Sequence, residues 1–334
     1  MKTKHFLLIA ILGLAACSQE PESSLKTYLG NVQGTTFNIR YISEDNINLD
    51  RKVDSVFKAI DASMSTYLPT STISKWNKGS QPMKIDEGFL DVLLASFELA
   101  KATNGLFDPT VGPLVQAWGF GEKSPDEMDS ILVKKILADV GYEKVLLFGD
   151  TTIGKINPNI QLDFNAIAQG YTVDQLAVLL SKNGIRNFMI EVGGELICRG
   201  INPDGKVWRI GIDKPSPQIQ EERFQAIIQL SNKALATSGN YRKFRTDPKT
   251  GIKYSHTINP KTGYPVNHQL LSVSVVGPNC MMADAYATSF MVMGLKSALE
   301  MLKTLKGWDA YFVFINAEGE WETYATNGFE KYIL

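Results

Sequence analysis

The uneven distribution of predicted strands along the chain is the feature that most restricts its fold. Short β-rich stretches predict strands at 34–42, 144–148, 188–192, 207–212, 224–230, 270–277 and 310–315. Apolar residues at helical spacing predict helices at 53–60, 89–104, 125–138, 171–182 and 281–305. Strands gather in the second half and do not alternate regularly with helices. This pattern favours an α+β fold with mixed or antiparallel sheets and packed helices over a doubly wound parallel sheet.

The first 30 residues differ in character from the rest. Lys2 and Lys4 precede an uncharged run from Phe6 to Ala16, which is too short to span a bilayer and is typical of a secretory signal. Small residues lead directly into Cys17, as in the lipobox where bacterial lipoproteins are cleaved and lipidated. We therefore expect a signal peptide at 1–16, a lipidated Cys17 and a polar tether over 17–30. A plain signal peptide with an incidental cysteine is the alternative.

This leader predicts a location in the bacterial cell envelope, anchored by lipid to a membrane and facing the periplasm. Which membrane carries the anchor stays open. The remaining region, 31–334, is long enough for one compact unit or two closely packed lobes. A formal net charge of −1 gives no basic field of the kind that binds nucleic acid. Cys198 and Cys280 could pair or remain two buried thiols.

Asp284 and Thr288 are a candidate site for a metal ion. They stand four residues apart in a predicted helix and therefore share one of its faces. A carboxylate and a hydroxyl are hard oxygen ligands, which suit Mg²⁺ better than zinc or copper. The alternative is structural, because an aspartate in a first helical turn stabilises the helix dipole and a threonine can bond back to a carbonyl.

Two loops offer main-chain groups to a ligand. Asp163 follows a predicted strand and opens the helix that begins near Tyr171, where backbone groups are unpaired. Local hydrogen bonding by Asp163 is an equally good interpretation. The second loop, 191–195, contains two adjacent glycines that permit a tight turn or a close approach by a ligand. That signal is weak alone.

His256 lies in a turn-forming stretch, Ser255-His256-Thr257-Ile258-Asn259-Pro260, and not in an apolar run. A histidine in a turn beside a strand is typical of a site residue. An exposed or structurally hydrogen-bonded histidine is the alternative. His268, a few residues further on, has no comparable neighbours and is expected at the surface.

Several blocks occur in one order along the chain: a strand with GTTF, MSTY with SKWN, FDPTVGPL with WGFG, LDFNAIAQGYTVD, EVGGE, ATSGNYRKF, SHTINPKTGYPV and ADAYATSFMVMG. In this order they resemble the ApbE-type FAD:protein FMN transferases, a family of periplasmic flavin transferases. The resemblance covers residues 30 to 334.

The resemblance implies a specific reaction. Family members use Mg²⁺ and transfer the FMN half of FAD through a phosphoester bond to a Ser or Thr hydroxyl of an acceptor protein, releasing AMP. The acceptors resemble flavin-bearing subunits of membrane redox complexes. His256, in the block S-H-x-I-x-P-x-T-G, would accept the proton of the acceptor hydroxyl or hold that hydroxyl in line.

Site residues follow from the same resemblance. It implies metal ligands at the Ala166 carbonyl, the Asp284 carboxylate, the Thr288 hydroxyl and the Ala287 carbonyl. The implied FAD contacts are Gln33, Tyr67, Leu106, Phe107, Asp108, Asp163, Gln169 and Ile258.

Two positions depart from the commoner family pattern. Gln33 stands where a methionine is frequent, and Gln169 stands where a lysine or glutamate is frequent. Both side chains can still reach a ligand, so the departures question individual contacts only.

Two rival functions fit parts of the pattern. A Mg²⁺-dependent FAD pyrophosphatase would use the same metal site with water as nucleophile, giving FMN and AMP. Tyr67 argues against it, because family members that hydrolyse FAD tend to lack an aromatic residue there. A non-catalytic FAD-binding lipoprotein would give Asp284, Thr288 and His256 no joint purpose.

Overall fold

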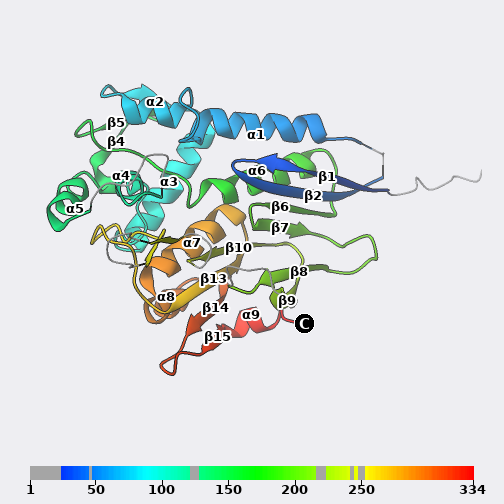
Figure 1. Ribbon diagram of the computed structural model, residues 1–334. Coiled ribbons are helices and arrows are strands. Elements are labelled where there is room, and N and C mark those ends of the chain that lie inside the picture. The colour runs from blue at the N-terminus through cyan, green and yellow to red at the C-terminus, as the bar shows by residue number, and fades with distance from the viewer. Residues whose placement is uncertain (1–23, 45–46, 121–127, 216–222, 241–243, 247–252) are drawn as a thin grey trace, which may run out of the picture.

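An eight-stranded sheet forms the centre of the molecule (Figure 1). The structure is a computed structural model, and it describes residues 24–44, 47–120, 128–215, 223–240, 244–246 and 253–334. Strand order is β1-β2-β6-β7-β10-β13-β14-β15, and every neighbouring pair is antiparallel. These strands span Ser24–Val32, Thr35–Ser43, Phe188–Val192, Glu195–Arg199, Lys233–Gly239, Leu270–Gly277, Asp309–Ile315 and Trp321–Ala325.

Helices cover one face of this sheet. They are α1 (Asp50–Met64), α3 (Glu87–Ala102), α6 (Ala168–Lys182), α7 (Cys280–Met293) and α8 (Leu295–Leu302). Alternate residues of the strands supply the two sides of the core. Ile190 and Ile197 pack with α1 and α6, whereas Met189 and Cys198 pack on the opposite face. That alternation is what a sheet buried on both faces requires.

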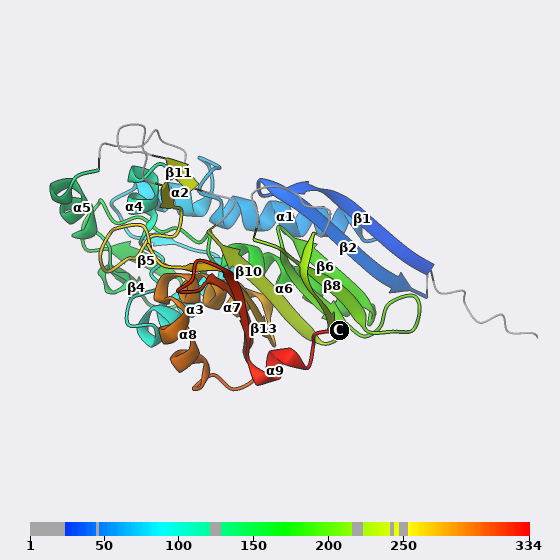
Figure 2. The same cartoon turned by 60° about the horizontal axis from the view of Figure 1, so that its bottom comes forward.

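The opposite face is covered by the β8–β9 hairpin (Trp208–Asp213 and Phe224–Leu230) and by α9 (Asn327–Glu330). In Figure 2, β1 and β2 lie at one edge of the large sheet and extend to the right beyond its other strands. A smaller region lies beyond the helices: α2 (Thr72–Lys78), α4 (Gly112–Ala117), α5 (Ser130–Leu137) and a small sheet of β3 (Met83–Lys84), β5 (Thr152–Lys155) and β4 (Val145–Phe148). A separate antiparallel pair is formed by β11 (Phe244–Thr246) and β12 (Lys253–Ser255), directly before His256.

The α+β prediction is confirmed, and the molecule is one compact domain. The strands predicted at 188–192, 224–230 and 270–277 have the predicted bounds. The helix predicted at 281–305 is two helices, because Gly294 adopts φ 74° and stops α7 before α8 starts. Helix α5 begins at Ser130, where Asp129 accepts the N–H of Leu132, and residues 125–127 lie outside the described part.

The folded part of the chain begins earlier than predicted. The tether predicted over 17–30 is too long, because β1 begins at Ser24 and pairs along its whole length with β2. Residues 1–23, including the predicted signal peptide and Cys17, lie outside the described residues. No helix in the described part of the chain is both long and apolar enough to cross a membrane.

The two remaining cysteines are free thiols, and both are fully buried. Cys198 belongs to the core on one face of the sheet and Cys280 to the core on the other. Of the two possibilities that the sequence leaves open, the structure has the unpaired thiols.

Candidate active site

Helices α6 and α7 meet with their first turns in backbone contact. A Cβ atom added to Gly170 would lie 2.3 Å from the Cys280 carbonyl oxygen, so a glycine is needed where the helices cross. The Gly170 N–H donates to Asp284 Oδ2 at 3.1 Å. Asp284 itself is only 6% exposed. The first turns of α6 and α7 therefore meet at one carboxylate.

The carboxyl of Asp284 is electrostatically unusual. Burial raises its pKa to about 7, and the bond from the Gly170 N–H opposes that rise. Removing a carboxylate from water disfavours its charged form unless a positive charge lies nearby. A bound cation would supply such a charge. The position therefore suits a metal ligand better than a surface helix-capping aspartate.

The other predicted ligands belong to α7 or to the loop before α6. Helix α6 begins at Ala168, so the Ala166 carbonyl precedes the helix and is outside its hydrogen-bond ladder. The Thr288 hydroxyl lies 3.0 Å from Ser238 Oγ at the end of β10. Ala287 is inside α7, where its carbonyl takes part in the helix and can offer only its second lone pair. Ala287 is the weakest of the four candidates.

The predicted donors are mostly not acidic or histidine side chains. Among the residues that the structure describes, no three His, Cys, Asp or Glu side chains are grouped as a metal cluster. The predicted set contains one carboxylate, one hydroxyl and main-chain carbonyls, which is a hard oxygen set compatible with Mg²⁺.

The loop that carries Asp163 is held by side chains and not by a strand partner. The predicted strand before Asp163 is wrong, because Asn77 bonds both main-chain groups of Leu162, at 2.7 and 2.8 Å. The Asp163 N–H donates to the Pro109 carbonyl at 2.7 Å, and Asp163 Oδ1 accepts the N–H of Asn165. Burial raises the pKa of the Asp163 carboxyl. The predicted Asp163 and 106–108 segments are therefore adjacent.

Asp108 organises its own loop. Its Oδ1 accepts from the Thr110 N–H and hydroxyl, at 2.8 and 2.6 Å, and its Oδ2 accepts the N–H of Tyr142 at 2.9 Å. Since both carboxylate oxygens are used in this way, the segment Leu106-Phe107-Asp108 can offer a ligand mainly its main chain. Phe107 is buried in the core behind it.

Gln33 and Gln169 both lie near the N-terminal end of α6, Gln33 in the β1–β2 turn and Gln169 in the first turn of the helix. Gln33, at φ 53° in the β1–β2 turn, donates to Asp61 Oδ1 and Thr172 Oγ1, each at 3.2 Å. Gln169 Nε2 reaches within 2.8 Å of the position that a Cβ on Gly193 would occupy. The Gly193–Gly194 turn thus allows the close approach that the sequence indicated. The group that approaches it is the Gln169 side chain.

His256 is half-buried in a loop that packs on α4. Its ring lies 6.4 Å from that of Phe120, edge to face. Next to it, Thr257 Oγ1 bonds Asn240 Oδ1 at 2.6 Å, and Ile258 bridges to Pro265. Trp118 Nε1 donates to the Gly263 carbonyl at 2.8 Å. These contacts attach the loop to β10 on one side and to α4 on the other.

Tyr67 is the last of the predicted site residues, and His268 is the histidine expected at the surface. Tyr67 is 58% exposed in the turn after α1, where a flat ring could stack on it. His268 is exposed, as expected, and its Nε2 lies 2.6 Å from the Met291 carbonyl. Sequence reasoning missed Ser238, Asn240 and Asn77 as individual residues. Their only signal was membership of the blocks ATSGN and SKWN.

Comparison with known proteins now identifies the family. The ApbE family model matches residues 33–312, well over half of the chain. The chain belongs to the ApbE family. It is 34% identical to the FAD:protein FMN transferase of Haemophilus influenzae, over 96% of this chain and 94% of that protein. The corresponding protein of Escherichia coli K12 is 31% identical, over 99% and 97%.

Solved ApbE structures have the same fold. The flavin transferase ApbE from Vibrio cholerae superimposes with a TM-score of 0.83 at 34% identity, covering 93% of this chain and 99% of that one. The apo form of the flavinyl transferase ApbE from Pseudomonas stutzeri gives 0.82 at 29% identity, covering 93% and 97%.

Proposed function

We propose that this ApbE-family protein transfers the FMN half of FAD to a Ser or Thr hydroxyl of an acceptor protein, forming a phosphoester and releasing AMP. The family membership and the names of the relatives support this proposal. The structural observation that carries it is the buried Asp284 carboxylate at the α6–α7 contact, with Thr288 one turn further along α7.

Mg²⁺ is the cation that we propose for this site. Its ligands would be the Asp284 carboxylate, the Thr288 hydroxyl and the Ala166 carbonyl, with Ala287 as a weaker fourth. When bound, Mg²⁺ would neutralise charge on the pyrophosphate of FAD and assist departure of AMP. Asp284 would supply the negative charge that holds the cation.

His256 would act on the nucleophile. The hydroxyl oxygen of the acceptor attacks the phosphorus of the FMN half, and the bond to the bridging oxygen on the AMP side breaks. His256 would accept the hydroxyl proton, so that the oxygen attacks with more negative charge. AMP leaves with the electron pair of the broken bond. Attachment of the His256 loop to both β10 and α4 supports a fixed position for the ring.

The flavin would be bound by the elements around this centre. Tyr67 offers an exposed ring for stacking, whereas the Ile258 side chain is buried in the core beside Leu114 and Trp118, so a contact from Ile258 would come from its main chain. Gln33, Gln169 and Asp163 offer polar groups at the N-terminal end of α6. The 106–108 segment would contribute main-chain groups, since the Asp108 carboxylate is engaged within its loop.

Transfer is tested with protein lacking residues 1–17, FAD, Mg²⁺ and a flavin-accepting domain of a membrane redox complex that another ApbE transferase is able to modify. A gain of one FMN mass on the acceptor, with an equal amount of AMP, is the expected result. Free FMN and AMP with an unmodified acceptor would instead establish a pyrophosphatase. Bound, unchanged FAD would indicate a carrier.

The metal site is tested by Asp284→Asn. Asparagine keeps an oxygen that can accept the Gly170 N–H, but it removes the charge that the cation needs. We expect transfer to fall by about 10³-fold, which corresponds to losing several kcal/mol of charge stabilisation. An unchanged rate and an unchanged Mg²⁺ requirement would disprove the ligand assignment.

We also propose that Cys17 is lipidated and that the enzyme works at the periplasmic face of a membrane. The seven residues from Cys17 to Ser23 precede β1, so the folded domain would lie within about 25 Å of the lipid. Labelled palmitate should appear in the wild-type protein and be absent from Cys17→Ala. Equal labelling of the two proteins would exclude Cys17 as the attachment site.

A further inference from the structure

Helices α6 and α7 are joined by reciprocal hydrogen bonds. An aspartate of each helix accepts backbone N–H groups from the first turn of the other. On α6, Gly170 and Asp174 are four residues apart and lie on one face; on α7, Cys280 and Asp284 have the same relation. Asp284 of α7 accepts the N–H of Gly170 on α6. Asp174 of α6 accepts the N–H of Cys280, at 2.8 and 3.0 Å, and that of Met281 at 2.8 Å.

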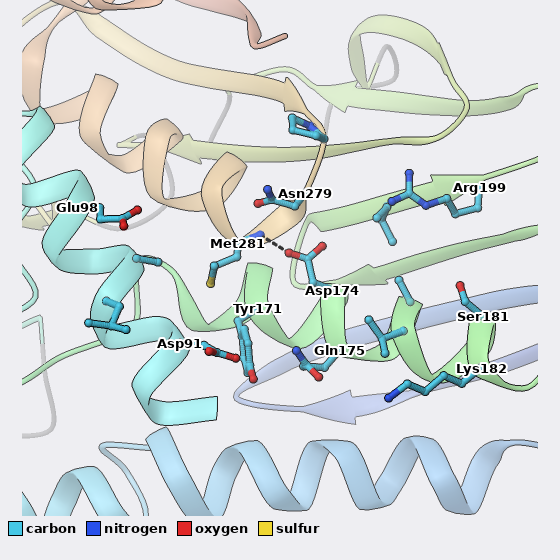
Figure 3. A pocket seen from close by; sticks show the side chains of 16 residues that line it. Asp91, Glu98, Tyr171, Asp174, Gln175, Ser181, Lys182, Arg199, Asn279 and Met281 are labelled. Atoms are coloured by element: carbon cyan, nitrogen blue, oxygen red, sulfur yellow. Dashed lines mark hydrogen bonds between the residues drawn. The ribbon is translucent and has the colours of Figure 1, made fainter. Parts of the chain in front are cut away.

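Figure 3 shows the bonding of Asp174 to the start of α7. Asp174 points from α6 to the first turn of α7, and the dashed line joins it to Met281. Asn279 lies beside it and accepts the N–H of Met282 at 2.9 Å with its own side chain. The first three N–H groups of α7 are therefore bonded, two of them by a residue of the other helix.

We infer that Asp174 is a positioning residue for the metal site: its carboxylate fixes the start of α7 against α6, and so fixes Asp284 and Thr288 relative to the Ala166 loop. This inference rests on the proposed Mg²⁺ site. Asp174 lies in the groove between α3 and α6 and is not among the metal-ligand candidates. It acts on them only through the backbone of α7.

The geometry explains why this contact matters more than an ordinary helix cap. Hydrogen bonds from backbone N–H groups to a carboxylate are among the stronger ones, and here they cross between two elements. Asp284 is one helical turn from Cys280, so a shift at the start of α7 moves its carboxylate by a similar amount. Metal ions tolerate little displacement of their ligands, and outer contacts of this kind typically change metal affinity by about 10- to 100-fold.

The test compares three variants in their response to Mg²⁺ itself. With FAD present and no acceptor, the rise in melting temperature is followed as MgCl₂ is added, and the concentration giving half of the rise is measured. For Asp174→Asn, which keeps the side-chain shape, we expect this concentration to increase about 10-fold or more. The transfer rate should recover at high Mg²⁺, and KM for the acceptor should stay unchanged.

Two controls separate positioning from loss of stability. Asn279→Ala removes a cap from the same helix end but leaves the contact between α6 and α7 intact. Asp86→Ala removes the cap of α3, which Asp86 provides by accepting the N–H of Phe89 at 2.9 Å. Both should lower the melting temperature and leave the Mg²⁺ midpoint within about 2-fold of wild type, a far smaller change than the outer-contact effect.

Each outcome is decisive. An unchanged Mg²⁺ midpoint in Asp174→Asn, with a lower melting temperature, would overturn the positioning role and leave Asp174 as a structural cap. An equal shift in Asn279→Ala would do the same. If the melting temperature of the wild type does not respond to Mg²⁺, the proposed metal site is wrong. The hydrogen bonds between α6 and α7 are unaffected by that result, but Asp174 then has no metal site to position.

Discussion

The metal-ligand candidates and His256 are supported by very different structure. Asp284 and Thr288 lie on a buried helix that touches α6 backbone to backbone. His256 lies on a half-buried loop held by individual hydrogen bonds, those of Thr257 to Asn240 and of Trp118 to Gly263. The first region cannot change without disturbing the core, whereas the second can be altered one contact at a time. Binding of the cation and activation of the hydroxyl should therefore be separable by mutation.

Gly170→Ala should have the largest effect on stability, because it pushes apart the backbones of α6 and α7 where they are in contact. The new methyl group would meet the Cys280 carbonyl, which is backbone and cannot rotate away. We expect unfolding free energy to fall by about 3 kcal/mol, measured by urea denaturation. Gly205→Ala is the control, since its added Cβ has open space and only its φ of 72° is unfavourable. Equal stability of the two variants would contradict the close helix contact.

His256→Gln should leave the fold intact and reduce transfer strongly. Loss of a general base typically costs about 10²–10⁴-fold in kcat. The melting temperature and the Mg²⁺ midpoint should stay at the wild-type values, because the loop is separate from the α6–α7 contact. His268→Gln serves as the matched histidine control. Wild-type kcat in His256→Gln would remove this residue from the mechanism.

Trp118→Phe tests how firmly the loop must be held. The ring contacts with Tyr254 and Tyr264, at 5.0 and 5.9 Å between centroids, can largely persist, but the bond to the Gly263 carbonyl is lost. A carbonyl left without this donor costs about 1–3 kcal/mol. We expect kcat to fall about 10-fold, equivalent to about 1.4 kcal/mol, with little change in Mg²⁺ dependence.

Trp208→Phe provides the matched comparison for Trp118→Phe. Trp208 Nε1 bonds the Arg199 carbonyl at 3.0 Å on the far side of the sheet, so the same atoms are removed at a distance from the loop. A similar loss of kcat in both variants would mean that general destabilisation, and not the His256 loop, is responsible.

Tyr67→Ala should have the smallest effect. The side chain is 58% exposed, so its removal should change stability by less than about 0.5 kcal/mol. Loss of an aromatic contact with the flavin is worth about 0.5–1.5 kcal/mol, which predicts a rise of about 2- to 10-fold in KM for FAD. Tyr324→Ala, at a similarly exposed position, should leave KM unchanged. An unaltered KM in Tyr67→Ala would exclude stacking there.

The sequence predicted the α+β class and several strand bounds because the residues of those strands are mostly apolar and β-branched or aromatic. Phe188–Val192 and Leu270–Gly277 are also almost fully buried, whereas Phe224–Leu230 is buried only at Ile228 and Leu230. It missed β7 and β10, whose residues do not alternate with polar ones: Glu195–Arg199 is largely buried, and Lys233–Gly239 carries small residues. It also read 281–305 as one helix, since apolar spacing continues through Gly294 and only the backbone turn there separates α7 from α8.

The candidate site could be predicted only as types of residue at certain spacings. The i, i+4 relation of Asp284 and Thr288 is visible in the sequence, but the contact of Asp284 with Gly170 depends on a helix crossing. Asp174 had no signal of its own, because its partners lie 106 and 107 residues away. Contacts of that kind arise from tertiary packing, which periodicity does not record.

The two buried thiols have a consequence for handling the protein. Cys198 and Cys280 lie in cores on opposite faces of the sheet, and burial raises the pKa of both thiols. Neither can be oxidised or alkylated readily while the sheet is closed, since the reactive form is an accessible thiolate. The rate at which these thiols are alkylated therefore reports how often the core opens.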